Sequence, residues 1–316
     1  MPASYREIDY RIRPGKHSER NMMVEAFRRL RFGTVESYQY VGLGSVYFSD
    51  FLLMHRALGI SRLVSIERAE HDRQRFEANK PFECVEMMWG DTSAELPKVD
   101  FDMRSIVWLD YDGRLGRSIL GDIREVAGRA VGGTVLAVTV QCRFDRISGE
   151  DGADRSVEKL VGELGSERVP HDISVGDIRG SGTGRLFRNV IQQEIAEAIA
   201  ERNAGRHSAQ EMRFKQILNF RYEDGVKMMT VAFVFYDAGQ EQILALCGFE
   251  DLAFFRDGEE SFDIEIPKLT PREIKFLEAQ MPRDADDLDL QAIPSRDASQ
   301  YARIYRYFPN LAFVDG

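Results

Sequence analysis

Glu67, Asp91 and Asp110 each stand at or just after the end of an apolar run of the chain. A carboxylate in such a place can accept hydrogen bonds from ribose hydroxyls or an amino group, or can take a proton from a nucleophile. If the apolar runs are parallel strands, their carboxyl ends meet at one edge of a sheet, where the acids face a ligand. A second interpretation stays open, in which Glu67 caps a helix and Asp91 is an ordinary turn residue.

An earlier apolar run ends in the glycine turn Gly42-Leu43-Gly44-Ser45. Glycines at these two positions let the backbone turn tightly and let a ligand approach its N–H groups. The dinucleotide fingerprint requires a third glycine where this chain has Tyr47, which disfavours NAD and FAD. The chain has no GxxxxGK[ST] sequence, so a P-loop is excluded.

These residues need a scaffold in which strands and helices alternate, and the hydrophobic pattern predicts one. Strands are expected at 37–43, 62–67, 84–88, 105–110, 134–142, 212–222, 226–236 and 261–266. Helices are expected at 19–30 with Ser18 as the cap, and at 46–58, 69–79, 116–130, 155–164, 186–203 and 270–280. Asp224-Gly225 between two strand-like runs predicts a hairpin. The glycine-rich segment 176–185 is interpreted either as a mobile lid or as a plain connecting loop.

From residue 38 to residue 236 the sequence resembles the class I S-adenosylmethionine-dependent methyltransferases. The resemblance implies an α/β fold, a Rossmann-like, doubly wound, mostly parallel seven-stranded sheet in the order 3-2-1-4-5-7-6 with helices on both faces. It assigns Gly42, Gly44 and Ser45 to the methionine and ribose end of S-adenosylmethionine, Glu67 to the ribose, Asp91 to the adenine, and Asp110 to the methionine side or reaction centre. The predicted cofactor site also includes the neighbouring residues Tyr40, Arg68 and Thr92.

The sequence departs from the family pattern at the first loop. An acid usually begins that loop and a third glycine usually lies near position 46, where this chain has Tyr38-Gln39-Tyr40 and Val46. The N-terminal arm, the helix around 51–55 and the segment 79–82 are similar to bacterial proteins described as O-methyltransferases.

Asp110-Tyr111-Asp112-Gly113 is the predicted reaction centre. Methyl transfer from a sulfonium is an in-line displacement, so the protein mainly positions the nucleophile and excludes water. One carboxylate can hold the methionine amine, and the other can deprotonate a hydroxyl or orient an amine. Tyr111 can form a wall beside the methyl group. The motif lacks the two prolines of [DNS]PP[YFW], which disfavours methylation of adenine or cytosine amino groups. Capping acids in a plain loop are the alternative.

Arg13, Lys16 and Arg114 are candidates for binding an anionic substrate, since residues 1–31 carry a net charge of +4. A solvated amphipathic segment explains the same charges. The three cysteines are far apart and the five histidines are scattered, so no structural metal site is predicted. Asp110, Asp112 and Asp145 give a weak alternative of a metal-dependent catechol-type site.

With 316 residues and 43% hydrophobic residues, the chain is long enough for one large α/β domain with additions. We expect an N-terminal arm and helix at 1–36, the methyltransferase domain at 37–240, and a C-terminal extension at 241–316 packed on the core. The net charge of −10 disfavours nucleic acid as a partner without excluding it. The polar start of the chain and the absence of long apolar runs predict a cytoplasmic protein without membrane segments.

The predicted function is S-adenosylmethionine-dependent methyl transfer to an oxygen or nitrogen of an unidentified acceptor. One alternative is a non-catalytic Rossmann-like module that binds a nucleotide or a partner protein. Another is a methyltransferase that modifies nucleic acid. The C-terminal extension leaves a homodimer open.

Overall fold

The computed structural model describes residues 13–144, 146–148 and 154–309. Within these residues the strands form a single eight-stranded sheet in the order β3-β2-β1-β4-β5-β7-β6-β8. The predicted order 3-2-1-4-5-7-6 is confirmed, and β8 adds one strand beyond it. The strands are β1 (Gln39–Leu43), β2 (Arg62–Glu67), β3 (Val85–Trp89), β4 (Ser105–Arg114), β5 (Val135–Gln141), β6 (Met212–Glu223), β7 (Lys227–Asp237) and β8 (Phe262–Ile264).

The first five strands are parallel, so their carboxyl ends lie at one edge of the sheet. The central residues of β1, β2, β4 and β5 are mostly apolar and buried because helices cover both faces, whereas β3 at the edge of the sheet is only partly buried. β7 runs antiparallel to β5, and β6 runs antiparallel to β7 across the predicted Asp224-Gly225 hairpin. The hairpin turn therefore lies at the same edge as the ends of β4 and β5.

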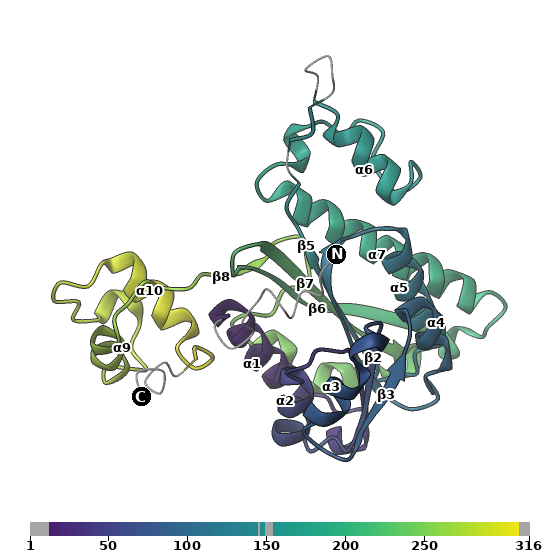
Figure 1. Cartoon of the computed structure of the whole chain (residues 1–316), viewed down its shortest axis with the longest axis horizontal. Helices are drawn as coiled ribbons and strands as arrows, with labels where there is room; N and C mark the ends of the chain where they lie inside the picture. Colours follow the sequence, from purple (N-terminus) through teal and green to yellow (C-terminus); the bar gives the residue numbers. More distant parts are fainter. Residues whose placement is uncertain (1–12, 145, 149–153, 310–316) are drawn as a thin grey trace.

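Helices on the two faces build separate apolar clusters (Figure 1). Helices α1 (Pro14–Arg28), α2 (Ser49–Leu58) and α3 (Arg73–Asn79) pack with side chains such as Tyr40 and Trp108 on one face. Helices α5 (Arg117–Arg129) and α7 (Gly182–Asn203) pack on the other face, with the short α4 (Thr92–Glu95) beside them. Along β4, successive side chains alternate between these faces, so Trp108 and Asp110 share the α1 face and Tyr111 lies on the other.

Helix α1 begins at Pro14, which corrects the predicted start at residue 19 and the predicted cap Ser18. The Asp224 carboxylate accepts hydrogen bonds from the backbone N–H of Gly15 (3.0 Å) and of Lys16 (2.8 Å). A cap that arrives from a residue over 200 positions away cannot be recognised from local sequence. Ser18 instead lies buried inside the helix and donates to the Pro14 carbonyl.

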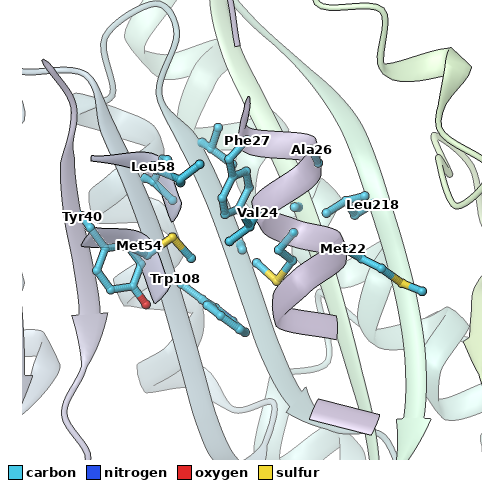
Figure 2. Close-up of a cluster of buried hydrophobic side chains, with 14 of the residues drawn as sticks. Met22, Val24, Ala26, Phe27, Tyr40, Met54, Leu58, Trp108 and Leu218 are labelled. Carbon is cyan, nitrogen blue, oxygen red and sulfur yellow. The ribbon is translucent and has the colours of Figure 1, made fainter. Parts of the chain in front are cut away.

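The later turns of α1 are apolar and cover the sheet. Figure 2 shows this helix lying over the strands, with the side chains of Met22, Phe27 and Leu218 gathered around it. All three are fully buried. This packing fixes the helix, and with it the polar first turn, over the edge of the sheet where the parallel strands end.

Other boundaries also differ from the predictions. Helix α2 begins at Ser49, not at 46, because Phe48 before it has a left-handed backbone with φ of 47°. Helix α7 begins at Gly182, so the second half of the predicted glycine-rich loop is helical. Thr183 is buried and its hydroxyl donates to the Ile178 carbonyl (2.8 Å), so the residues from Gly182 on belong to a helix and not to a loop.

The remaining elements lie beyond this core. Helix α6 (Ser156–Leu164) projects past the sheet, and α9 (Pro271–Glu278) and α10 (Ser295–Ile304) form a lobe joined through β8 (Figure 1). Helix α8 (Glu241–Leu246) follows β7. Thr270 and Glu273 form the capping box predicted for α9. Tyr307 anchors the lobe, since its hydroxyl donates to Glu25 of α1 (2.7 Å). Among the described residues, no helix is long and apolar enough to cross a membrane.

Candidate cofactor and active site

The glycine turn lies directly against Glu67. Gly44 donates its backbone N–H to the Ile66 carbonyl, and a Cβ at Gly44 would stand 2.8 Å from Oε2 of Glu67. A Cβ at Gly42 would stand 2.8 Å from the Tyr40 hydroxyl. Glycine is therefore required at both positions, because each backbone passes a polar side chain too closely for any larger residue.

Glu67 ends β2 half-buried and points toward this turn. Its Oε1 accepts a hydrogen bond from the backbone N–H of Ala69 (2.7 Å), while no hydrogen bond to Oε2 occurs within the described chain. Burial raises the pKa of Glu67, against the lowering effects of the Ala69 N–H and of the charge and N–H of Arg68, and the negative charge of Asp112 adds a smaller rise. Oε2 of Glu67 therefore lies beside the glycine turn as a hydrogen-bond acceptor. Asp112 lies close enough for its charge to affect the Glu67 carboxyl group. The neighbouring Arg68 is exposed.

Asp91 and Thr92 follow β3 at the same edge. The Asp91 carbonyl accepts the N–H groups of Ala94 and Glu95, so its backbone begins α4, but its side chain does not cap the helix. The Asp91 carboxylate is exposed and makes no hydrogen bond to other described residues. Thr92 is half-buried. The exposed carboxylate is available to a ligand that lies over the ends of β2 and β3.

Asp110 lies on the α1 face at the end of β4, with about a fifth of its side chain exposed (22%). Its Oδ1 accepts a hydrogen bond from the Lys16 ammonium at 2.7 Å. The Trp108 ring, two residues earlier on the same face, lies 4.3 Å below that ammonium. The structure therefore joins two predicted site residues, Lys16 and Asp110, that stand 94 positions apart in the chain.

Tyr111 and Asp112 do not lie with Asp110. The Tyr111 hydroxyl donates to Asp122 of α5 (2.6 Å), on the opposite face of the sheet. Burial, followed by the charge of Asp122, raises the pKa of Tyr111. Asp112 is exposed where β4 extends past its neighbours, and its carbonyl accepts from the Gln141 side chain. The predicted motif is thus divided between the two faces and the open edge.

The three cations predicted to bind substrate do not form one patch. Lys16 is buried, and the Arg13 guanidinium lies 3.9 Å from Asp224. Arg114 instead pairs with Glu163 of α6 (2.8 Å) and stacks on Phe144.

A buried polar layer between α1 and the sheet was not predicted. The Glu19 carboxylate bonds Lys16 (2.8 Å) and accepts the Thr230 hydroxyl of β7, and Thr230 bonds Thr139 of β5 (2.7 Å). Trp108 closes the layer by donating its indole N–H to Thr139 (2.9 Å). A signal was present in the sequence, because Lys16 and Glu19 continue the helical face of Met23 and Phe27 that meets the core.

Arg20 forms a second buried pair in the same region. It donates to Asp50 in the first turn of α2, and both side chains are about nine-tenths buried. Asp50 therefore neutralises a cation of α1, which links α1 to the helix that follows the glycine turn.

No group of three or more metal-binding side chains occurs among the residues that the structure describes. Asp145, part of the weak metal alternative, lies outside the described residues.

The comparison with family models matches residues 8–315, nearly the whole chain, to a family described as "Putative O-methyltransferase". The chain belongs to this family. The predicted resemblance to methyltransferases and the enzyme class are thereby confirmed. The search among curated proteins finds no match.

Several solved structures match this chain at low sequence identity. TomG, an O-methyltransferase of Streptomyces achromogenes solved with SAM, has 18% identity over 68% of this chain and 79% of its own, with a TM-score of 0.37. The mitomycin 7-O-methyltransferase MmcR has 11% identity over 68% and 53%, with a TM-score of 0.34. The fibrillarin/Nop5p complex has 7% identity over 70% and 82%, with a TM-score of 0.40. These likenesses are too weak to bear on function.

Proposed function

We propose that the protein transfers the methyl group of S-adenosylmethionine to a hydroxyl oxygen of an acceptor molecule. Membership of the O-methyltransferase family supports the reaction class and favours oxygen over the nitrogen that the sequence left open. The observation that carries the proposal is the contact between the Gly44 turn and the half-buried Glu67 carboxylate.

The residues at this edge fit the cofactor. Oε2 of Glu67 lies beside a turn that leaves no space for a side chain. It is therefore placed to accept hydrogen bonds from ribose hydroxyls. Asp91 offers an exposed carboxylate over the end of β3, suited to the adenine amino group. Gly42, Gly44 and Ser45 form the backbone beside the methionine end. Bound S-adenosylmethionine supplies an electrophilic methyl group on a sulfonium.

Two residues of the chain would then position the cofactor and the acceptor hydroxyl for an in-line displacement. Asp110 keeps one carboxylate oxygen without a hydrogen-bond partner in the described chain, and it would hold the methionine ammonium there. Asp112 is exposed at the end of β4. It would accept the proton of the acceptor's hydroxyl group while the oxygen of that hydroxyl forms its bond to the methyl carbon. The bound cofactor would supply the methyl group and would keep the electron pair of the broken carbon–sulfur bond on its sulfur, so the hydroxyl proton is what the protein has to accept. Positioning of these groups accounts for most of the rate gain.

Titration calorimetry with S-adenosylhomocysteine tests the cofactor site. We expect micromolar binding by the wild type and a loss of about tenfold or more for Glu67→Ala, since hydrogen bonds to a charged acceptor contribute about 1.5–3 kcal/mol each. Glu70→Ala, an exposed acid three residues on, is the matched control and should bind as the wild type does. Absence of heat in a folded wild-type sample would refute the proposal and favour the non-catalytic module.

Nucleic acid is the less favoured acceptor. Lys16 and Arg20, two cations of the basic N-terminal segment, are buried against carboxylates of this chain. They are therefore not presented to a phosphate backbone. Oligonucleotide binding with a steep salt dependence would reverse this preference.

A further inference from the structure

Lys16 is buried in the protein interior. Its side chain is 1% exposed, and its ammonium contacts Asp110 Oδ1 at 2.7 Å and Glu19 Oε2 at 2.8 Å. The ring of Trp108 lies 4.3 Å away and that of Tyr222 lies 5.6 Å away. A lysine is almost never buried to this degree unless its ammonium is paired with a negatively charged group.

Of the two carboxylates, Asp110 is the one that reaches solvent. Glu19 is fully enclosed, and burial raises its pKa, against the lowering effect of the Lys16 charge. Asp110 is 22% exposed at the functional edge. The charge of Lys16 is therefore balanced mainly by Asp110, while Glu19 and Thr230 connect the ammonium to the strands.

The position of Lys16 is set from outside the strand–helix repeat. Asp224, in the turn between β6 and β7, holds the backbone N–H groups of Gly15 and of Lys16 itself. The β6–β7 hairpin thus fixes the first turn of α1, and that turn delivers the ammonium to the end of β4. Three distant segments of the chain meet in this contact.

We propose that Lys16 is a positioning residue that keeps the Asp110 carboxylate ionised and oriented, with its second oxygen turned to the methionine ammonium of the cofactor. The inference rests on the proposed function, because Asp110 meets an ammonium ligand only if S-adenosylmethionine binds at this edge. Lys16 itself does not touch the ligand; it acts through Asp110.

Other charged and titratable groups face Asp110 from every neighbouring element. Those whose fields couple with it are Glu19 and Arg20 of α1, Tyr40 of β1 and Tyr222 of β6. Arg20 is already paired with Asp50. With Lys16 removed, Asp110 would lose the cation that contacts it directly, and the loss of an ion-pair partner favours the protonated form of a carboxyl group.

A double-mutant cycle with Lys16→Met and Asp110→Asn provides the test, read out as S-adenosylhomocysteine affinity by calorimetry. Each single variant is expected to weaken binding about tenfold or more. The double variant, a neutral pair of similar shape, should bind no more weakly than either single variant. It also serves where Lys16→Met alone does not fold. Losses that multiply in the double variant would overturn the proposal.

The pH profile separates positioning from a purely structural role. The wild type gives the baseline ratio of affinities at pH 6 and pH 8, to which Glu67 contributes. For Lys16→Met we expect binding to fall further at pH 6, relative to pH 8, than it does in the wild type, because a carboxylate that loses its cation partner gains a proton at a higher pH. Lys16→Arg should restore the wild-type ratio. An unchanged ratio in Lys16→Met would refute the proposal.

Two controls complete the design. Lys98→Met removes a lysine that is also paired at 2.7 Å, but with Glu95 and not with Asp110, and it should leave the ratio unchanged. Carboxyl carbon NMR of Asp110 in ligand-free protein should show a higher pKa in Lys16→Met than in the wild type. An equal pKa would overturn the proposal. Failure of wild-type protein to bind S-adenosylhomocysteine, with this NMR shift present, would instead refute the proposed function alone.

Discussion

Replacing Gly44 by alanine tests whether the turn at the end of β1 must pass directly over Glu67. The added Cβ would stand 2.8 Å from Oε2 of Glu67, 2.9 Å from its Cβ and 3.1 Å from the Ser65 hydroxyl. Carbon atoms essentially never approach the first two atoms so closely. Because the Glu67 Cβ is fixed to strand β2, the clash cannot be relieved by rotating the end of a flexible side chain alone.

The magnitude follows from these contacts. Inserting a methyl group into a tightly packed place costs about 1–3 kcal/mol of unfolding free energy. Moving the Glu67 carboxylate also weakens its hydrogen bonds to a bound ribose, each worth about 1.5–3 kcal/mol at a charged acceptor. We therefore expect Gly44→Ala to lower the urea midpoint and to weaken S-adenosylhomocysteine binding by about 10-fold to 100-fold.

Gly113→Ala is the matched control. Gly113 lies at the same edge, at the end of the Asp110-Tyr111-Asp112 segment, but nothing stands within 4 Å of its added Cβ. Its unfolding free energy should change by less than about 0.5 kcal/mol, because no atom meets the added methyl group. Urea unfolding and calorimetry of both variants give the result. Equal behaviour of Gly44→Ala and Gly113→Ala would show that the turn does not lie against Glu67.

Three further predictions concern the cap, the acid and the lobe. Asp224→Ala should cost about 1–2 kcal/mol in urea unfolding, because two helix N–H groups lose their acceptor, whereas its exposed neighbour Glu223→Ala should cost little. Because burial raises the pKa of Glu67, S-adenosylhomocysteine affinity should fall as the pH is lowered through that pKa and the carboxylate gains a proton; Glu67→Gln should lose this dependence in calorimetry at pH 5 to 8. Tyr307→Phe, which removes the 2.7 Å bond to Glu25, should cost about 0.5–1.5 kcal/mol in urea unfolding and should speed proteolysis of the C-terminal lobe; an unchanged cleavage rate would count against this anchor.

The order of strands β1 to β7 could be predicted because it depends on local patterns and on one resemblance. Apolar runs, glycine turns and the Asp224-Gly225 hairpin are all signals within a few residues. The same holds for the capping box at Thr270 and Glu273, where the partners are three residues apart. β8 was expected only as an edge strand, and its parallel pairing with β6 depends on the path of the intervening chain.

The candidate site likewise has features that the sequence predicts and features that depend on tertiary packing. Placing Glu67 beside the glycine turn and Asp91 at the same edge needed only the rule that parallel strands end at one edge of a sheet. The division of Asp110 and Tyr111 between two faces follows from strand alternation, but which face meets α1 and which meets α5 does not. Arg114 carries no sign in the sequence of its pairing with Glu163, because that contact depends on where α6 lies.

By itself, the sequence determined the kind of fold, the edge of the sheet proposed to bind the cofactor and the acids that stand at that edge. Tertiary structure alone decided that Lys16 neutralises Asp110 and that Asp224 caps α1. The physical reason is that a buried charge is stable only beside a partner, and packing of the apolar turns of α1 on the sheet selects that partner. Composition and periodicity place charged residues on a helix face, but only the assembled core determines what faces them.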